Sequence, residues 1–204
     1  MKNQLRAIGD FWRQEYGRFV GMTAIAFLVL TVLAYIAGRL FPDIPVTIMD
    51  YFSDAIDSSG IVQEDGSFSM LALLGNNVRA MVLSALYGFI PFLYLPALSL
   101  GLNAAIIGML AAMMQEQWLL FAAGILPHGI FELPALILSL AAGLCLCQNI
   151  NHYINHYIRK NEKGVMKPLM LNLLRVMCLL VLPLLVIAAV MECYVTPQVM
   201  QLFM

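Results

Sequence analysis

Two ionisable side chains, His128 and Glu132, lie in the middle of an otherwise apolar stretch of the chain. They are four residues apart, so on a helix they share one face, one turn apart. Between residues 118 and 147 the only other ionisable groups are cysteine thiols. Placing a charged group among hydrocarbon costs free energy, because the charged form loses its water. A partner, a water-filled cavity or a functional role must therefore offset the cost of this pair.

The spacing of this pair suits metal coordination but supplies only two ligands. A catalytic zinc ion takes three protein ligands and a water, and the chain has no His-Glu-x-x-His motif. A second pair, His152 and His156, lies in a repeated Asn-His-Tyr-Ile at 151–158. Its position beside basic residues and two tyrosines favours a helix at the membrane surface, with metal binding the open alternative. The sequence therefore predicts no metal site and no cofactor.

The composition indicates the class of protein. The 204 residues are 62 % apolar and only 11 % charged, and the mean hydropathy is +0.85. A soluble domain carries about 25 % charged residues. This chain therefore has too few charged groups to cover a globular surface in water. We therefore expect an all-α, polytopic protein of the cytoplasmic membrane, surrounded by lipid. No basic stripe for nucleic acid and no glycine-rich phosphate loop is present in the sequence.

The apolar runs predict five transmembrane helices in a single membrane domain, 1–204, at about 20 residues for each crossing. The uncharged run at 80–114 is barely long enough for two crossings, and we divide it near 99–103. The predicted segments are an inner-surface amphipathic helix at 1–19, spans at 20–40, 76–98 and 101–115, a broken segment and span at 118–150, a last span at 171–193, an acidic loop at 41–70 and a basic loop at 151–170.

The distribution of charge predicts the orientation of these spans. Lysine and arginine precede the first span and lie again between the fourth and fifth, whereas residues 41–77 contain only acidic charges. Because cytoplasmic segments carry the excess of basic residues, we expect the N-terminus inside and the C-terminus outside. The amphipathic helix at 1–19 would lie on the inner surface, with Leu5, Ile8, Phe11, Trp12 and Phe19 facing lipid.

Proline and glycine residues at membrane depth predict interruptions of the helices. Clusters of these residues within overlong apolar runs are typical of discontinuous helices, whose freed carbonyls find partners on neighbouring helices. The expected break positions are Pro91, Pro96, Pro127, Gly129 and Pro134.

The polar residues of the spans predict an intramembrane polar core. Its expected members are Asn77, Arg79, Asn103, His128 and Glu132. We expect an ion pair between Arg79 and Glu132, because a guanidinium stays charged and can bind a carboxylate with two hydrogen bonds. Asn77 and His128 would complete the hydrogen bonds of this pair. The core would either lock helices together or contact a substrate or ion.

The acidic loop predicts a helix lying on the outer leaflet. Apolar residues between Val46 and Ile56 recur at helical spacing, and Asp50, Asp54 and Asp57 fall on the opposite side. These acids could be merely solvated, or they could form a docking face for an extracytoplasmic protein. Calcium binding is a further alternative, although the spacing of a known calcium loop is absent.

The order of these motifs resembles the stage II sporulation protein M family. The matching residues are Gly75-Asn76-Asn77-Val78-Arg79, Gly101-Leu102-Asn103-Ala104 with Gly108, and Leu126-Pro127-His128-Gly129 followed by Glu132-Leu133-Pro134-Ala135. Ala104 departs from the Asn-Gly expected in the family. The resemblance implies a membrane scaffold that acts with an extracytoplasmic peptidoglycan hydrolase and another membrane protein in the wall remodelling of engulfment.

Three functions therefore compete at this point. The first is a non-enzymatic scaffold for cell-envelope machinery, and the second is a transporter or permease subunit with a polar site at His128 and Glu132. An intramembrane metallohydrolase is the third and the least favoured. Small residues such as Gly108 and Gly143 would permit tight helix packing, either within one copy or in a homo-oligomer.

Overall fold

The computed structural model describes residues 2–48, 69–158 and 166–203, and in these ranges the chain is helical, without a strand. Five of its helical segments are long and apolar enough to cross a membrane, which confirms the predicted number of spans. These segments are Asn3–Leu40, Met70–Phe89, Leu95–Met113, Gln115–Asn155 and Met166–Gln201. The chain is therefore a multi-pass, all-α membrane protein.

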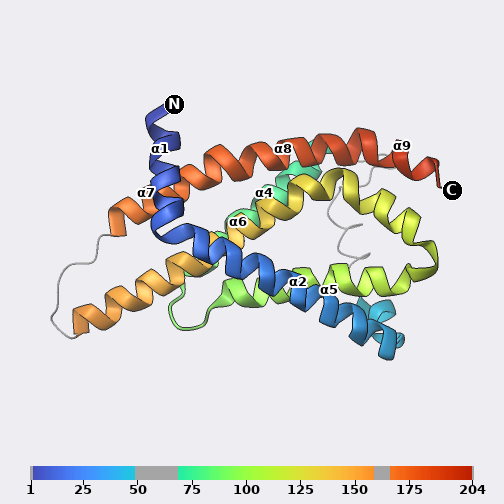
Figure 1. Cartoon of the computed structure of the whole chain (residues 1–204), viewed down its shortest axis with the longest axis horizontal. Coiled ribbons are helices and arrows are strands. Elements are labelled where there is room, and N and C mark those ends of the chain that lie inside the picture. The colour runs from blue at the N-terminus through green and yellow to red at the C-terminus, as the bar shows by residue number, and fades with distance from the viewer. Residues whose placement is uncertain (1, 49–68, 159–165, 204) are drawn as a thin grey trace.

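The first span continues the N-terminal helix without a gap. Helix α1 (Lys2–Phe11) passes through a π-helical turn, η1 (Trp12–Tyr16), into α2 (Gly17–Leu40). Helix α1 bends away from α2 and crosses α7 (Met166–Val176), as Figure 1 shows. The side chain of Arg175 on α7 donates a hydrogen bond of 2.5 Å to Gln4.

This docking corrects the prediction that the apolar face of residues 1–19 meets lipid. Ile8, Phe11 and Phe19 are buried inside the protein, whereas Leu5 and Trp12 are exposed as predicted. Ile8 and Phe11 of α1 are therefore used for packing against the protein itself. Their periodicity is the same in both cases, because a helix needs one apolar face whether lipid or another helix covers it.

The second and third spans meet at a turn that begins about ten residues before the predicted division. Helix α4 (Met70–Leu86) ends in a short 3₁₀ turn, η2 (Tyr87–Phe89), and α5 begins at Leu95 and ends at Met113. Phe92 and Tyr94 in the turn adopt left-handed backbone conformations. Pro96 lies in the first turn of α5, where its missing N–H costs no hydrogen bond. The predicted division near 99–103 is wrong, and Asn103 lies inside α5.

The fourth span is one uninterrupted helix, α6, which extends over 41 residues from Trp118 to Ile158. Pro127, Gly129 and Pro134 all lie within it, so the break predicted at these three positions is wrong. Each proline removes one backbone hydrogen bond of the helix. Ending the helix there would free further backbone groups, and at membrane depth no water is available to bind them. The helix therefore curves, as Figure 1 shows for its first half, and does not end.

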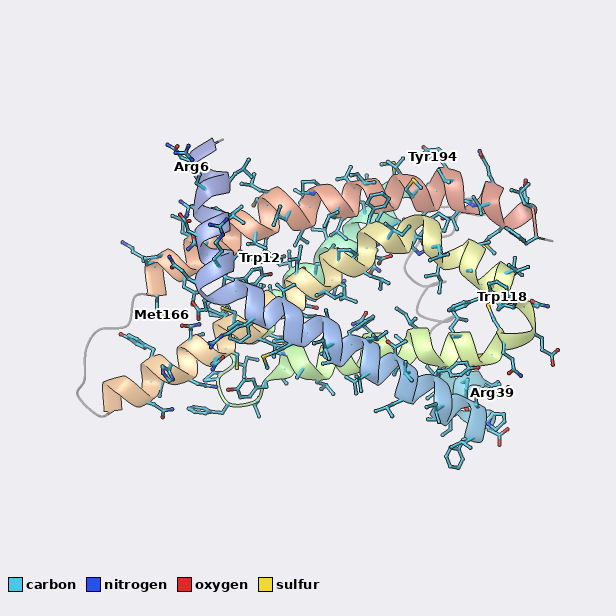
Figure 2. The ribbon with its side chains drawn as sticks, viewed as in Figure 1. Arg6, Trp12, Arg39, Trp118, Met166 and Tyr194 are labelled. Carbon is cyan, nitrogen blue, oxygen red and sulfur yellow. The ribbon has the colours of Figure 1, made fainter. Side chains whose placement is uncertain are left out.

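The fifth span contains two π-helical turns. Helix α7 leads through η4 (Met177–Val181) into α8 (Leu182–Val190), and η5 (Met191–Val195) then leads into α9 (Thr196–Gln201). Successive spans run in opposite directions, and the two termini lie in opposite halves of the long axis (Figure 1). We call the two ends of this axis the N-terminal end and the C-terminal end. Arg6 lies at the first and Trp118 at the second (Figure 2).

Small residues bring the helices of one copy close together. A β-carbon at Gly108 would collide with the backbone of α2 at Thr31 and Tyr35, and one at Gly143 would collide with Ser84 and Pro96. Interfaces between membrane helices favour such residues, because backbones can approach closely and gain dispersion contacts. Gly108 and Gly143 are thus used for packing within the chain.

Candidate functional site

Four side chains from two spans form the polar cluster, which we define as His128, Glu132, Glu192 and Thr196. His128 Nε2 lies 3.8 Å from Glu132 Oε2, and His128 Nδ1 lies 3.3 Å from Thr196 Oγ1. The ligand-type atoms of His128, Glu132 and Glu192 all lie within 4.8 Å of one another. The cluster therefore combines one imidazole and two carboxylates in membrane-spanning sequence.

The helical repeat explains why these residues meet. His128 and Glu132 are one turn apart on α6, as the sequence predicts. On the fifth span, Leu185, Ala188 and Ala189 form a buried stripe. Glu192 and Thr196 continue that stripe at helical spacing, through the π-helical turn η5. π-Helical turns are rare and occur often at functional sites.

The hydrogen bonds of Thr196 determine which imidazole nitrogen carries the proton. The Thr196 hydroxyl donates its single hydrogen to the carbonyl of Met191, at 3.2 Å. Its oxygen therefore accepts from His128, so we assign the proton to Nδ1. The lone pair of Nε2 then faces Glu132. In this tautomer, Nε2 can coordinate a cation through its lone pair.

Arg79 does not form the predicted ion pair. Its side chain is exposed on α4, and within the described part of the chain the carboxylate of Glu132 lies beside the imidazole of His128 instead. Asn77 is half-buried on the same helix. The hydrogen-bond partner of the His128 side chain is Thr196, and not Asn77. The rotation of α4 about its own axis explains the difference, because it turns Arg79 away from α6. The partners of the pair belong to the fifth span.

Asn103 is also outside the polar cluster. Its amide donates a hydrogen bond of 2.8 Å to the carbonyl of Ser99, one turn earlier on the same helix. The Ser99 hydroxyl lies 3.3 Å from the hydroxyl of Ser84 on α4. The contact between Ser84 and Ser99 joins the second and third spans, whereas the bond of Asn103 stays within α5.

A second polar network, toward the N-terminal end, was not anticipated from the sequence. The amide of Asn149 on α6 donates to Glu15 at 2.7 Å and to the carbonyl of Cys145 at 2.9 Å. The buried hydroxyl of Tyr16 donates to the carbonyl of Leu138 at 2.5 Å. Both contacts fix the π-helical turn η1 against α6. The signal in the sequence is a carboxylate and a tyrosine just before the first apolar run.

The turn before α5 is held by α6. The backbone N–H of Phe92 donates to the side-chain carbonyl of Asn151 at 3.0 Å, and the thiol of Cys147 donates to the carbonyl of Ile90 at 3.6 Å. Backbone in the left-handed region is strained for non-glycine residues, so surrounding contacts must hold it. Asn151 is buried and supplies one of these contacts.

Two open hollows lie at the C-terminal end, on either side of the turn between α5 and α6. The first, of about 450 Å³, is bordered by residues that include Arg39, Pro45 and Glu116. The second, of about 470 Å³, is bordered by residues that include Glu116, Trp118 and Phe203. Polar side chains of the turn thus face recesses at this end.

Other predicted site residues fall on parts that the structure does not describe. Asp50, Asp54 and Asp57 lie outside the described residues, as does the side chain of His156. His152 is exposed on α6. The proposed docking face and the second histidine pair therefore stay predictions.

Comparison with known proteins identifies the family. The model of the family described as "Stage II sporulation protein M" matches residues 19–197. The chain belongs to this family. It is also 29 % identical over 175 residues to an uncharacterized protein of Methanocaldococcus jannaschii, a match that covers 84 % of this chain and 94 % of that protein. No solved structure matches the chain. The family match includes every member of the polar cluster, and it confirms the resemblance seen in the sequence.

Proposed function

We propose that this chain is a non-enzymatic component of the cytoplasmic membrane that positions cell-envelope machinery, of the peptidoglycan-remodelling type used in sporulation and engulfment. The family match over residues 19–197 carries this proposal. The arrangement of the bundle supports it, since several polar groups join one helix to another, among them Glu15, Tyr16 and Asn151. A bundle held together in this way suits a scaffold that presents a fixed surface.

The partner in this proposal is an extracytoplasmic peptidoglycan hydrolase, or another membrane protein, bound at the C-terminal end. Two observations support this choice of surface. The predicted acidic face at Asp50, Asp54 and Asp57 follows α2 in the sequence, and α2 ends at this end of the molecule. The two hollows beside Glu116 also lie here.

Photo-crosslinking in native membranes tests this surface. A photoreactive residue at Gln117, which is exposed and borders both hollows, should capture a wall hydrolase or a membrane protein repeatedly. The matched control carries the same residue at Val29, which is exposed in the middle of α2. Recovery of the same few proteins from both positions, or of this chain alone from Gln117, would contradict the proposal.

Charge removal tests the acidic face separately. The triple variant D50N/D54N/D57N should weaken recovery of the partner. If charge steers the encounter, the loss should be largest at low ionic strength and should shrink as salt screens the wild-type acids. Asp10→Asn, at the opposite end of the bundle, is the control. Unchanged recovery with the triple variant would show that these acids take no part.

The same proposal requires the C-terminal end to face outward, as the basic residues predict. Single cysteines at Gln117 and Asn155, in a background without the four native cysteines, test this orientation. Both positions are exposed and lie at opposite ends of the fourth span. A membrane-impermeant thiol reagent applied to intact cells should label position 117 and spare position 155. The reverse pattern would place the proposed docking surface in the cytoplasm and refute it.

The polar cluster favours a second candidate function, that of a transporter or permease subunit. Ionisable residues in membrane-spanning sequence commonly lie on pathways for ions or substrates. Liposomes that contain the purified chain should then show a flux of protons or divalent cations that Glu132→Gln abolishes and Glu116→Gln preserves. Flux equal to that of empty liposomes for these ions would exclude this function for them.

A further inference from the structure

The polar cluster assembles three groups of the types that hold metal ions. We propose that His128, Glu132 and Glu192 bind one divalent transition-metal ion, with Thr196 orienting the imidazole. This proposal is independent of the scaffold role, because a structural ion would serve a scaffold and a permease alike.

The separations within the cluster suit a shared ion. Metal–nitrogen and metal–oxygen bonds are about 2.0–2.2 Å long, so two ligands of one ion lie roughly 3.0–3.5 Å apart. His128 Nε2 and Glu132 Oε2 are 3.8 Å apart, which is too long for a hydrogen bond and close to this ligand spacing. A carboxylate oxygen of Glu192 lies within 4.8 Å of a ring nitrogen of His128 and of a carboxylate oxygen of Glu132. Small rotations of the carboxylates would close the remaining distance.

The imidazole already has the orientation that a metal ligand needs. Histidine ligands generally donate their other ring N–H to a neighbouring group, which fixes the tautomer and the ring plane. In this cluster Nδ1–H donates to Thr196 Oγ1, and the hydroxyl donates onward to the carbonyl of Met191. Thr196 is itself buried. The lone pair of Nε2 therefore faces the carboxylate of Glu132.

The charge of the cluster also calls for a cation. Two carboxylates this close repel each other when both are ionised, and the repulsion is stronger in a span than in water. Among the residues that the structure describes, the imidazole beside Glu132 is neutral in the assigned tautomer, and Arg79 lies exposed on another helix. A divalent ion would neutralise both acids at once. Two protonated acids would satisfy the same constraint without metal, and the experiment below separates the two cases.

The donor set indicates the class of ion. Imidazole suits zinc, iron, copper and nickel, whereas carboxylates alone suit magnesium, calcium and manganese. One imidazole with two carboxylates and no thiolate therefore favours Zn²⁺, Fe²⁺ or Mn²⁺ over Ca²⁺ or Cu⁺. The sequence expectation of no metal site rested on a count of two ligands, His128 and Glu132. Glu192 supplies the third from another span.

Metal analysis of the purified full-length chain tests the site. After treatment with a chelator, the protein is dialysed against Zn²⁺ or Mn²⁺, and the retained ion is measured by mass spectrometry. The wild-type chain should retain about one ion, as expected of a single closed site. Glu192→Gln and His128→Ala should weaken binding at least about 100-fold, and Thr196→Val by about 10–100-fold, because it removes only the orienting contact.

Two controls make the result specific. Glu116→Gln removes an exposed acid at the same end and should bind as wild type does. A double variant, H152A/H156A, removes the other histidine pair and should also retain the ion. Loss of the ion in the double variant, with retention in Glu192→Gln, would place the metal elsewhere and overturn the proposal.

A measurement on the unmodified chain covers the case in which the variants fail to fold. Titration with Co²⁺, a spectroscopic substitute for zinc, should give visible absorption bands that excess Zn²⁺ abolishes. Absence of these bands, together with retention of Zn²⁺ and Mn²⁺ no higher than in a buffer blank, would show that the cluster binds no metal and would overturn the proposal.

Discussion

Replacing Gly108 by alanine would place a methyl group where α5 meets the backbone of α2. The new β-carbon would lie 2.7 Å from the β-carbon of Ala34 and 2.8 Å from the amide nitrogen of Tyr35, and closer still to the carbonyl oxygen of Thr31. Carbon contacts are most favourable at about 3.5–4.0 Å, so the two helices would have to move apart. Two of these three atoms belong to the backbone, and no change of rotamer can relieve the collision.

Gly101 on the same helix provides the matched control, because a β-carbon there meets no atom within 4 Å. Both substitutions gain the same helix propensity, about 0.8–1.0 kcal/mol, so the difference between them isolates the collision. Overpacking costs about 1–3 kcal/mol, and contact with backbone favours the upper half of this range. We therefore expect Gly108→Ala to be about 2–3 kcal/mol less stable than Gly101→Ala.

Thermal and detergent-induced unfolding measure this difference. For a chain of this length a change of 1 kcal/mol moves Tm by about 2–4 °C, so the two variants should differ by about 4–12 °C. Tryptophan fluorescence on heating gives Tm, and far-ultraviolet circular dichroism in increasing dodecyl sulfate gives the free energy of unfolding. Equal shifts for the two variants would mean that α5 does not approach α2 as closely as the structure has it, and would refute the reasoning.

Three further predictions concern contacts between helices. Tyr16→Phe removes the hydrogen bond to Leu138 and should destabilise the chain by about 0.6–1.7 kcal/mol in the same unfolding assay, the range measured for such bonds in membrane proteins; no change would mean that the hydroxyl is not bonded. Asn151→Ala removes the partner of the Phe92 N–H, so amide hydrogen exchange in the turn before α5 should speed up, and exchange at the wild-type rate would show that Asn151 does not hold the turn. Arg79→Ala should change the free energy of unfolding by less than about 0.5 kcal/mol, because the side chain is exposed. A loss of several kcal/mol would indicate that Arg79 does form the ion pair with Glu132.

The number of spans follows from the sequence alone, for a local physical reason. A helix crosses the membrane only if about 20 consecutive residues are apolar, and this property is read from composition. The same logic drew attention to His128 and Glu132, since any ionisable group in such a run is costly. Their shared helix face is also local, because spacing by four residues fixes it.

The sequence could not tell which of the prolines interrupt a helix. Proline weakens a helix, but whether the helix ends depends on what replaces the lost hydrogen bond. Around Pro127 and Pro134 the helix α6 continues. At Pro91 the chain turns, and the turn is supported by Asn151 and Cys147, residues that lie more than 50 positions away. These contacts exist only after the fourth span has packed beside the turn.

The partners of the polar pair were decided by the tertiary structure. Arg79 and Glu192 both lie on helices that contact α6. The rotation of each helix about its axis determines which side chain faces the pair, and packing of the whole bundle sets that rotation. Burial of Leu185 and Ala188 turns Glu192 and Thr196 toward His128, while α4 presents Arg79 outward. Sequence thus determines which residues must find partners in the membrane, and the packing of helices determines which partners they find.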